Sequence, residues 1–153
     1  MRQLADTIEI LSPPKTVWRV LSDPTFIPKL YNDAVTIEVD PPGPVHEGQS
    51  AKVLARIAGV KVVVMVRFTE VEKEVYLGSK VIPGGLFDAF DHTVALRALG
   101  WGTEAKITFA YSVAPQYASK IPDMPLLERA LNENFRTYAL NLKDISELIP
   151  LPE

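Results

Sequence analysis

The segment from about residue 124 to residue 149 constrains the fold most, because its apolar residues recur at a helical spacing for about seven turns. Asp123 is a suitable N-cap for this helix, and Pro150 ends it. The apolar stripe consists of Leu127, Leu131, Phe135, Tyr138, Leu142, Ile145 and Ile149. A helix with one apolar stripe must bury it, so the rest of the chain has to supply an apolar face of matching length.

Residues 34 to 115 supply that face, since apolar and polar residues alternate along segments that are separated by Pro, Gly and other turn residues. A similar alternation predicts an earlier strand over residues 3 to 11. The six later strands are predicted near residues 35–39, 51–57, 60–68, 75–82, 90–99 and 103–113. The long helix should lie across the antiparallel sheet that these seven strands form.

Two short helices are predicted between the first and second strands. Pro13 or Pro14 can begin the first helix, with Ser12 as its N-cap, because the missing N–H of proline costs nothing in the first turn. Asp23 precedes Pro24, where the first helix should end, and can cap a second helix that runs to Tyr31. The prediction is therefore a single α+β domain over residues 1–153.

Composition excludes several classes of function. Sixteen Lys and Arg against nineteen Asp and Glu give a formal net charge of −3 and leave no basic cluster for nucleic acid. The chain has no Cys, and its two His lack a metal-ligand spacing, so we expect no disulfide, metal or other cofactor. No apolar run approaches the roughly 20 residues of a transmembrane helix, and Asp6 interrupts the start before a signal-peptide core develops. We expect a cytoplasmic protein.

Two polar residues of the long helix point toward the predicted sheet. Asn134 lies three residues after Leu131 and four before Tyr138, in the centre of the apolar stripe. Each of the two polar side chains has two interpretations: a structural hydrogen bond in the core, or contact with a bound ligand. Leu131 and Phe135 would line the same space.

Asp6 and His92 each interrupt the inward-facing series of a strand. Asp6 stands between Leu4 and Ile8, and His92 stands between Phe90 and Val94. A carboxylate facing an imidazole could act as an acid–base pair, although the spacing in the sequence does not bring the two together. The other interpretations are a polar end of a ligand site and an ordinary structural placement.

Pro83-Gly84-Gly85 precedes two large apolar residues, Leu86 and Phe87, at a predicted turn between strands. Exposed apolar side chains at a flexible turn are costly unless they cover something. We expect Leu86 and Phe87 to fold over a cavity mouth as a lid, with a dimer or membrane contact as the alternative.

Four features of the chain are found together in a known superfamily: the strand-to-helix start from Ile8 to Trp18, the helix break Leu21-Ser22-Asp23-Pro24, the turn Gly100-Trp101-Gly102-Thr103-Glu104, and the long final helix. In these features the chain resembles the START-related helix-grip superfamily (SRPBCC), which includes polyketide cyclase/dehydrase, birch-pollen-allergen-like and coenzyme Q-binding proteins. The resemblance implies a seven-stranded curved sheet that wraps around the C-terminal helix and leaves a cavity for a hydrophobic molecule such as a lipid, quinone or polyketide.

Three functions remain open. The first is binding or carrying of a small hydrophobic ligand, with Asp6, His92, Asn134 and Tyr138 at its polar end. The second is a polyketide cyclase/dehydrase-like enzyme that uses the same residues to orient a substrate. The third is an accessory subunit, or a homodimer, that uses an exposed apolar loop to bind a protein. The lack of a nucleophile–base motif favours binding over catalysis.

Overall fold

The computed structural model describes residues 1–31, 34–119 and 124–150, and it confirms the predicted α+β fold. Its strands are β1 (Arg2–Ile10), β2 (Ala34–Asp40), β3 (Ser50–Ile57), β4 (Val60–Glu72), β5 (Tyr76–Val81), β6 (Phe87–Leu99) and β7 (Gly102–Val113). Its helices are α1 (Pro14–Ser22), the 3₁₀ turn η1 (Pro24–Phe26), α2 (Ile27–Leu30), α3 (Pro115–Ala118) and α4 (Met124–Leu148). The predicted N-cap Asp123 lies outside the described residues.

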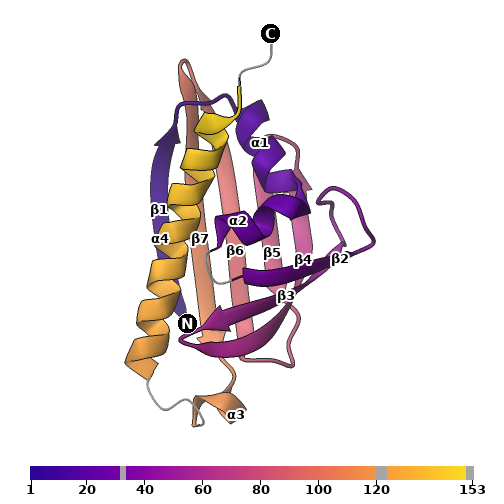
Figure 1. Ribbon diagram of the computed structural model, residues 1–153, viewed down its shortest axis with the longest axis vertical. Coiled ribbons are helices and arrows are strands. Elements are labelled where there is room, and N and C mark those ends of the chain that lie inside the picture. Colours follow the sequence, from indigo (N-terminus) through magenta and orange to yellow (C-terminus); the bar gives the residue numbers. More distant parts are fainter. Residues whose placement is uncertain (32–33, 120–123, 151–153) are drawn as a thin grey trace.

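The seven strands form one antiparallel sheet in the order β1-β7-β6-β5-β4-β3-β2 (Figure 1). Consecutive strands from β2 to β7 are neighbours, as short connections favour. The first strand is the exception, since β1 pairs with β7 instead of β2. The connection from β1 to β2 consequently crosses the sheet, and it carries α1, η1 and α2 onto the face that α4 also covers.

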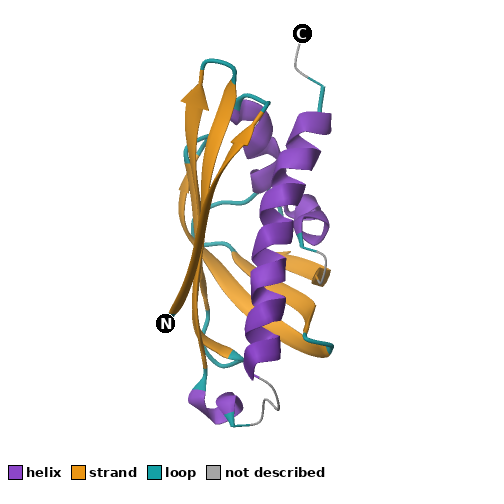
Figure 2. Cartoon of the chain, turned by 90° about the vertical axis from the view of Figure 1, so that its left-hand side faces the viewer, coloured by secondary structure: helices purple, strands orange, loops and turns teal. Residues whose placement is uncertain are grey.

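Helices α1, α2 and α4 lie on the concave face, and the sheet curls around them from the other side (Figure 2). The predicted stripe of α4 is the buried one: Leu127, Leu131, Phe135, Tyr138 and Leu142 are each less than one-tenth exposed. The apolar face of α1 is buried as predicted, with Val17, Trp18, Val20 and Leu21 in the core. Burial of these apolar side chains is the main stabilising contribution to the fold.

One end of the molecule is held by buried hydrogen bonds. The Thr103 hydroxyl donates to the Ser12 carbonyl at 2.7 Å, and the Ser12 hydroxyl donates to the Ser146 carbonyl at 3.0 Å. The prediction that Ser12 caps α1 is therefore wrong. Pro13 is the N-cap, and the Ser12 side chain binds α4 instead of the first turn of α1. These bonds join the start of α1, the start of β7 and the end of α4.

At the other end the sheet opens between β4 and β6. The β4–β5 ladder reaches only to the pair Val66 and Val81, beyond which the Ile82 N–H donates to the Met65 carbonyl at 2.7 Å. In the described sheet, residues 60–65 of β4 pair with β3, while the first residues of β6 pair with β7. The turn at residues 82–86 lies between these two separated segments.

The strand β6 begins at Phe87, three residues before the predicted start. The turn residues before it suggested a longer loop, but Phe87 is the ladder partner of Val113 in β7 and is only 2% exposed. Because the strand already begins at Phe87, the Phe87 side chain lies on the concave face at the opening between β4 and β6.

Candidate functional site

A row of four side chains crosses the concave face and forms the floor of the site. Strand pairing aligns Phe68 of β4 with Ser79 of β5, Ser79 with His92 of β6, and His92 with Phe109 of β7. Residues aligned in this way across a sheet share one face. The floor is therefore apolar at both ends and carries a hydroxyl and an imidazole at its centre.

The space above this floor, which we call the inner cavity, has a volume of about 140 Å³ and lies between the sheet, α2 and α4. None of the described residues that line it is Asp, Glu, Lys or Arg. Its walls are Leu21, Ile27, Leu30, Tyr31, Ile37, Ala51, Val53, Ala55, Ile57, Val64, Val66, Phe68, Leu77, Ser79, Phe87, Phe90, His92, Phe109, Leu131, Asn134 and Tyr138. A cavity with these walls suits an uncharged, mainly apolar molecule.

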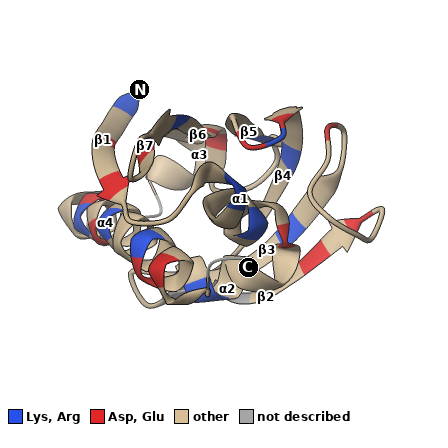
Figure 3. Cartoon of the chain, turned by 90° about the horizontal axis from the view of Figure 1, so that it is seen from above, with Lys and Arg blue, Asp and Glu red and all other residues tan. Residues whose placement is uncertain are grey.

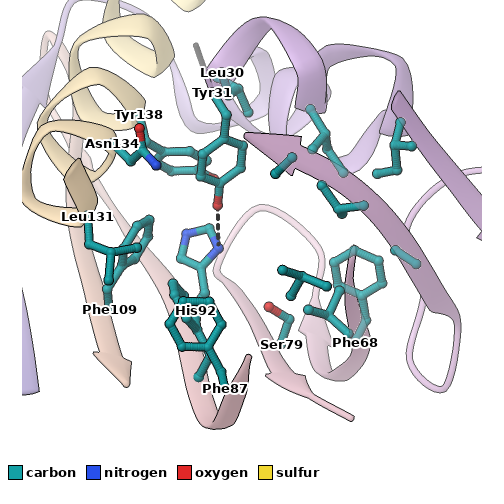
Figure 4. Close-up of a pocket in the computed structure, with 18 of the residues that line it drawn as sticks. Leu30, Tyr31, Phe68, Ser79, Phe87, His92, Phe109, Leu131, Asn134 and Tyr138 are labelled. Carbon is teal, nitrogen blue, oxygen red and sulfur yellow. Dashed lines mark hydrogen bonds between the residues drawn. The ribbon is translucent and has the colours of Figure 1, made fainter. Parts of the chain in front are cut away.

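His92 is the polar centre of the cavity floor. The Tyr31 hydroxyl, at the end of α2, lies 3.3 Å from the His92 Nδ1 atom and forms a hydrogen bond with it (Figure 4). The Nε2 atom of His92 is buried and has no hydrogen-bond partner. A neutral imidazole has one nitrogen that donates and one that accepts, so Nε2 offers an unused N–H or an unused lone pair. A buried polar atom left in this condition is costly unless a ligand or water satisfies it.

Aromatic rings hold the imidazole in place. The ring centroids of Tyr138 and Phe109 each lie 4.7 Å from that of His92, with interplanar angles of 85° and 77°. Tyr31 lies 4.9 Å from Tyr138, so the three polar rings form one cluster. Such edge-to-face contacts fix ring orientation, and the unpartnered nitrogen is therefore presented in one direction.

Burial keeps this cluster neutral. It lowers the pKa of His92 to about 3, and it raises the pKa of Tyr31 and Tyr138 above their ordinary value. The charged form of each group is disfavoured because water is removed from around it. At neutral pH the site consequently offers hydrogen bonds rather than charge.

Five of the predicted ligand-binding residues line this cavity: Phe87, His92, Leu131, Asn134 and Tyr138. Figure 4 shows Asn134, Leu131 and Tyr138 directed from α4 toward the sheet, as the helical spacing predicted. The structure thus brings one strand residue, His92, and the polar residues of the last helix to the same space.

Three predicted residues lie elsewhere. Asp6 lies on the same face of the sheet as its ladder partner Ile107, which is the concave face. Because β1 is an edge strand, however, the Asp6 side chain is exposed. The Asp6 carboxylate accepts a hydrogen bond from the Thr7 N–H at 2.9 Å and is separated from His92 by the whole of β7. Phe135 packs against Phe109 in the core at 4.9 Å, outside the cavity walls. The structure therefore does not form the acid–base pair considered for Asp6 and His92.

Leu86, the third of these residues, is half-buried and lines a second space of about 740 Å³. We call this space the outer groove. It lies where the sheet opens, and its walls are Ile57, Ala58, Lys61, Val62, Val63, Val64, Met65, Val81, Ile82, Pro83, Gly84, Gly85, Leu86, Phe87, Tyr117, Leu126 and Leu127. Ile57, Val64 and Phe87 also line the inner cavity, so these three side chains form the boundary between the two spaces.

The sequence analysis missed two site residues, Tyr31 and Ser79. Tyr31 was predicted only as an apolar member of the second short helix, although a tyrosine there brings a hydroxyl that needs a partner when buried. Ser79 lies in the inward series of β5, where a small polar residue among apolar ones was the available signal.

None of the Asp, Glu, Lys and Arg side chains whose burial the structure describes is fully buried. Figure 3 shows basic and acidic residues interspersed along α4 and the strands. Within residues 1–31, 34–119 and 124–150, no three acidic or His side chains gather as a metal site would require. None of the described helices is long and apolar enough to cross a membrane.

Comparison with known proteins identifies a family over nearly the whole chain. A family model described as polyketide cyclase/dehydrase and lipid transport matches residues 1–147. A search of curated proteins gave no match.

Solved structures share the fold at low sequence identity. The Zhui aromatase/cyclase of a Streptomyces species has a TM-score of 0.80 at 15% identity, covering 95% of this chain and 93% of that chain. TTHA0849 of Thermus thermophilus has a TM-score of 0.76 at 21% identity, covering 95% and 97%. A START superfamily protein of Mycobacterium smegmatis has a TM-score of 0.74 at 14% identity, also covering 95% and 97%. These likenesses confirm the predicted helix-grip fold.

Proposed function

The chain belongs to the family described as polyketide cyclase/dehydrase and lipid transport, and from this membership we propose that it binds a small, uncharged, apolar molecule with one polar group. The proposed site is the inner cavity, and the polar group contacts His92, Asn134 and Tyr138. The observation that carries the proposal is the unpartnered His92 Nε2 atom in an otherwise apolar cavity. A hydroxyl or carbonyl on the ligand would satisfy that atom.

Binding accounts for the site better than catalysis does. A general base works best when its pKa lies near the working pH, whereas burial lowers the pKa of His92 to about 3. The Tyr31 hydroxyl is the hydrogen-bond partner of the imidazole, and no described carboxylate lines the cavity to stabilise an imidazolium ion. The groups present are suited to recognising a neutral polar group.

A titration with phenol and toluene tests this function, because the two molecules have similar size and differ in the hydroxyl. We expect wild-type protein to bind both and to prefer phenol, measured by calorimetry or by NMR shifts. Ala55 lines the cavity on β3, so Ala55→Phe should fill it and abolish binding. Ala98→Phe, at an exposed position of β6, is the matched control and should bind as wild type does. Failure of wild type to bind either probe below about 1 mM, which corresponds to roughly 4 kcal/mol, would contradict the proposal.

Two further variants test the polar contacts from α4. Asn134→Leu and Tyr138→Phe each remove a polar group from the cavity wall while keeping a side chain of similar size. We expect each to weaken phenol binding by roughly 0.5–1.5 kcal/mol, the net contribution of one hydrogen bond, with little effect on toluene. Unchanged phenol affinity together with a lower melting temperature would assign both residues a purely structural role. Mass spectrometry of molecules extracted from purified protein would then identify the natural ligand class.

A further inference from the structure

We propose that the ligand is elongated, with a polar end of about one ring in the inner cavity and an apolar tail that passes Phe87 into the outer groove. This inference rests on the proposed function and specifies the class of molecule bound. Its basis is the size, connection and chemistry of the two spaces.

The inner cavity is too small for a whole lipid or polyketide. An apolar cavity of about 150 Å³ holds one benzene-sized molecule, whereas sites for drug-sized molecules measure roughly 300–1,000 Å³. The inner cavity has about 140 Å³, and the outer groove has about 740 Å³. A ring that reaches His92 fills the first space, and any larger part of the ligand needs the second.

The two spaces meet at a thin boundary. Ile57, Val64 and Phe87 line both, so apolar side chains from β3, β4 and β6 separate the two spaces. The sheet itself is interrupted here, because residues 60–65 of β4 and the start of β6 pair with different neighbours. A rotation of the Phe87 side chain would connect the spaces without breaking a ladder hydrogen bond.

The walls of the outer groove are mainly apolar, which fits a tail. Val62, Val63, Leu86 and Leu127 provide aliphatic walls, and Lys61 is the charged residue among the described walls. Lys61 is exposed, so its ammonium group can stay in water at the rim. An alkyl or isoprenoid-like tail gains by leaving water along such walls.

A homologous series of phenols from phenol to para-heptylphenol tests the inference by calorimetry. In wild type we expect affinity to rise about fourfold per added methylene, the value for apolar transfer from water. Val63→Trp places a large ring in the outer groove and should abolish this gain while leaving phenol affinity within twofold of wild type. Val75→Trp is the matched control, since Val63 and Val75 are both 44% exposed and Val75 lines neither space.

The outcomes separate this inference from the proposed function. A length-dependent gain in wild type and Val75→Trp, lost in Val63→Trp, supports an elongated ligand. If phenol binds but affinity does not change with length, the function stands and the tail site is overturned, which leaves the outer groove to another partner such as a protein. If the gain persists unchanged in Val63→Trp, the tail does not use the outer groove. If neither phenol nor its longer homologues bind, both proposals fail.

Discussion

At the scale of single residues, His92 is the most unusual feature of the protein. Its imidazole is enclosed by aromatic rings, forms a hydrogen bond to Tyr31 and has a buried nitrogen without a partner. Burial holds its pKa at about 3, far below the ordinary value near 6.5. The native state therefore resists protonation of His92, whereas the unfolded state does not.

This difference predicts a pH dependence of stability. Because the pKa of His92 is lower in the folded protein than in the unfolded chain, His92 does not reduce the free energy of unfolding above about pH 6.5. As the pH falls from there toward 3, its titration lowers the free energy of unfolding progressively. The unfolded chain binds the proton first, so the free energy of unfolding should fall by up to about 1.4 kcal/mol per pH unit in this range. Urea denaturation at a series of pH values measures this slope.

Two histidine variants complete that experiment. His92→Gln lacks the titrating ring and should lose this component of the slope, whereas His46→Gln, which removes the exposed histidine, should keep it. Equal slopes for wild type and His92→Gln would show that His92 does not control acid stability.

The alternation of residues along a strand predicts only part of a site. Alternation and helical spacing placed His92, Asn134 and Tyr138 on inward faces, and the cavity contains all three. The same parity argument included Asp6, because the pattern of a strand does not reveal whether the strand lies at an edge. Tyr31 was missed for a similar reason: its contact with His92 joins residues 61 positions apart.

At the scale of elements, the end of the molecule that contains Ser12, Thr103 and Ser146 is closely packed. Gly102 begins β7 there, and a Cβ atom at this position would lie 2.2 Å from the Ile10 carbonyl oxygen. Real atoms do not approach so closely, so backbone would have to move. The adjacent turn glycine, Gly100, has nothing within 4 Å of the corresponding position.

Gly102→Ala should therefore destabilise the protein by about 1–3 kcal/mol, the usual cost of forcing extra atoms into a packed site. Gly100→Ala adds the same methyl group in open space and should change stability by less than about 0.5 kcal/mol. Chemical denaturation of the two variants compares them directly. Similar losses in both would mean that the close approach of β1 and β7 does not restrict position 102.

The sequence pattern predicted the strands and the final helix more completely than it predicted where each strand ends and where the sheet opens. The seven strands and the final helix follow from periodicity, because a buried face repeats every two residues in a strand and every 3.6 in a helix. Phe87 was assigned to a loop because the glycines before it dominate the local pattern. The opening between β4 and β6 depends on how far each ladder extends, and local alternation carries no information on that length.

At the scale of the whole molecule, the two ends of the molecule differ in construction. Buried hydrogen bonds hold one end, and the other has an interrupted sheet, the turn at residues 82–86 and the outer groove. The lid role expected for Leu86 and Phe87 stays a prediction, and both residues lie at this open end. Phe87 is a strand residue at the boundary of the two spaces, and Leu86 lines the outer groove.

Hydrogen exchange with and without para-heptylphenol should reveal this asymmetry. We expect bound ligand to slow exchange in peptides that cover residues 82–87, because the tail restricts the turn. Peptides near Thr103 and Ser146 should change little, since that end is already closed. Saturating ligand without added protection at residues 82–87 would exclude this turn as the moving element.

The pairing of β1 with β7 has a consequence for the order in which the protein folds. Ile10 pairs with Thr103 and Arg2 with Tyr111, so the first strand must wait for roughly a hundred further residues to be synthesised. Helix α4 follows later still, and until it packs, the apolar concave face is open to water. Contacts between segments so far apart in the sequence slow folding and prolong the lifetime of aggregation-prone intermediates. The surface that later lines the inner cavity is thus also a surface at which the chain can aggregate while it is being made.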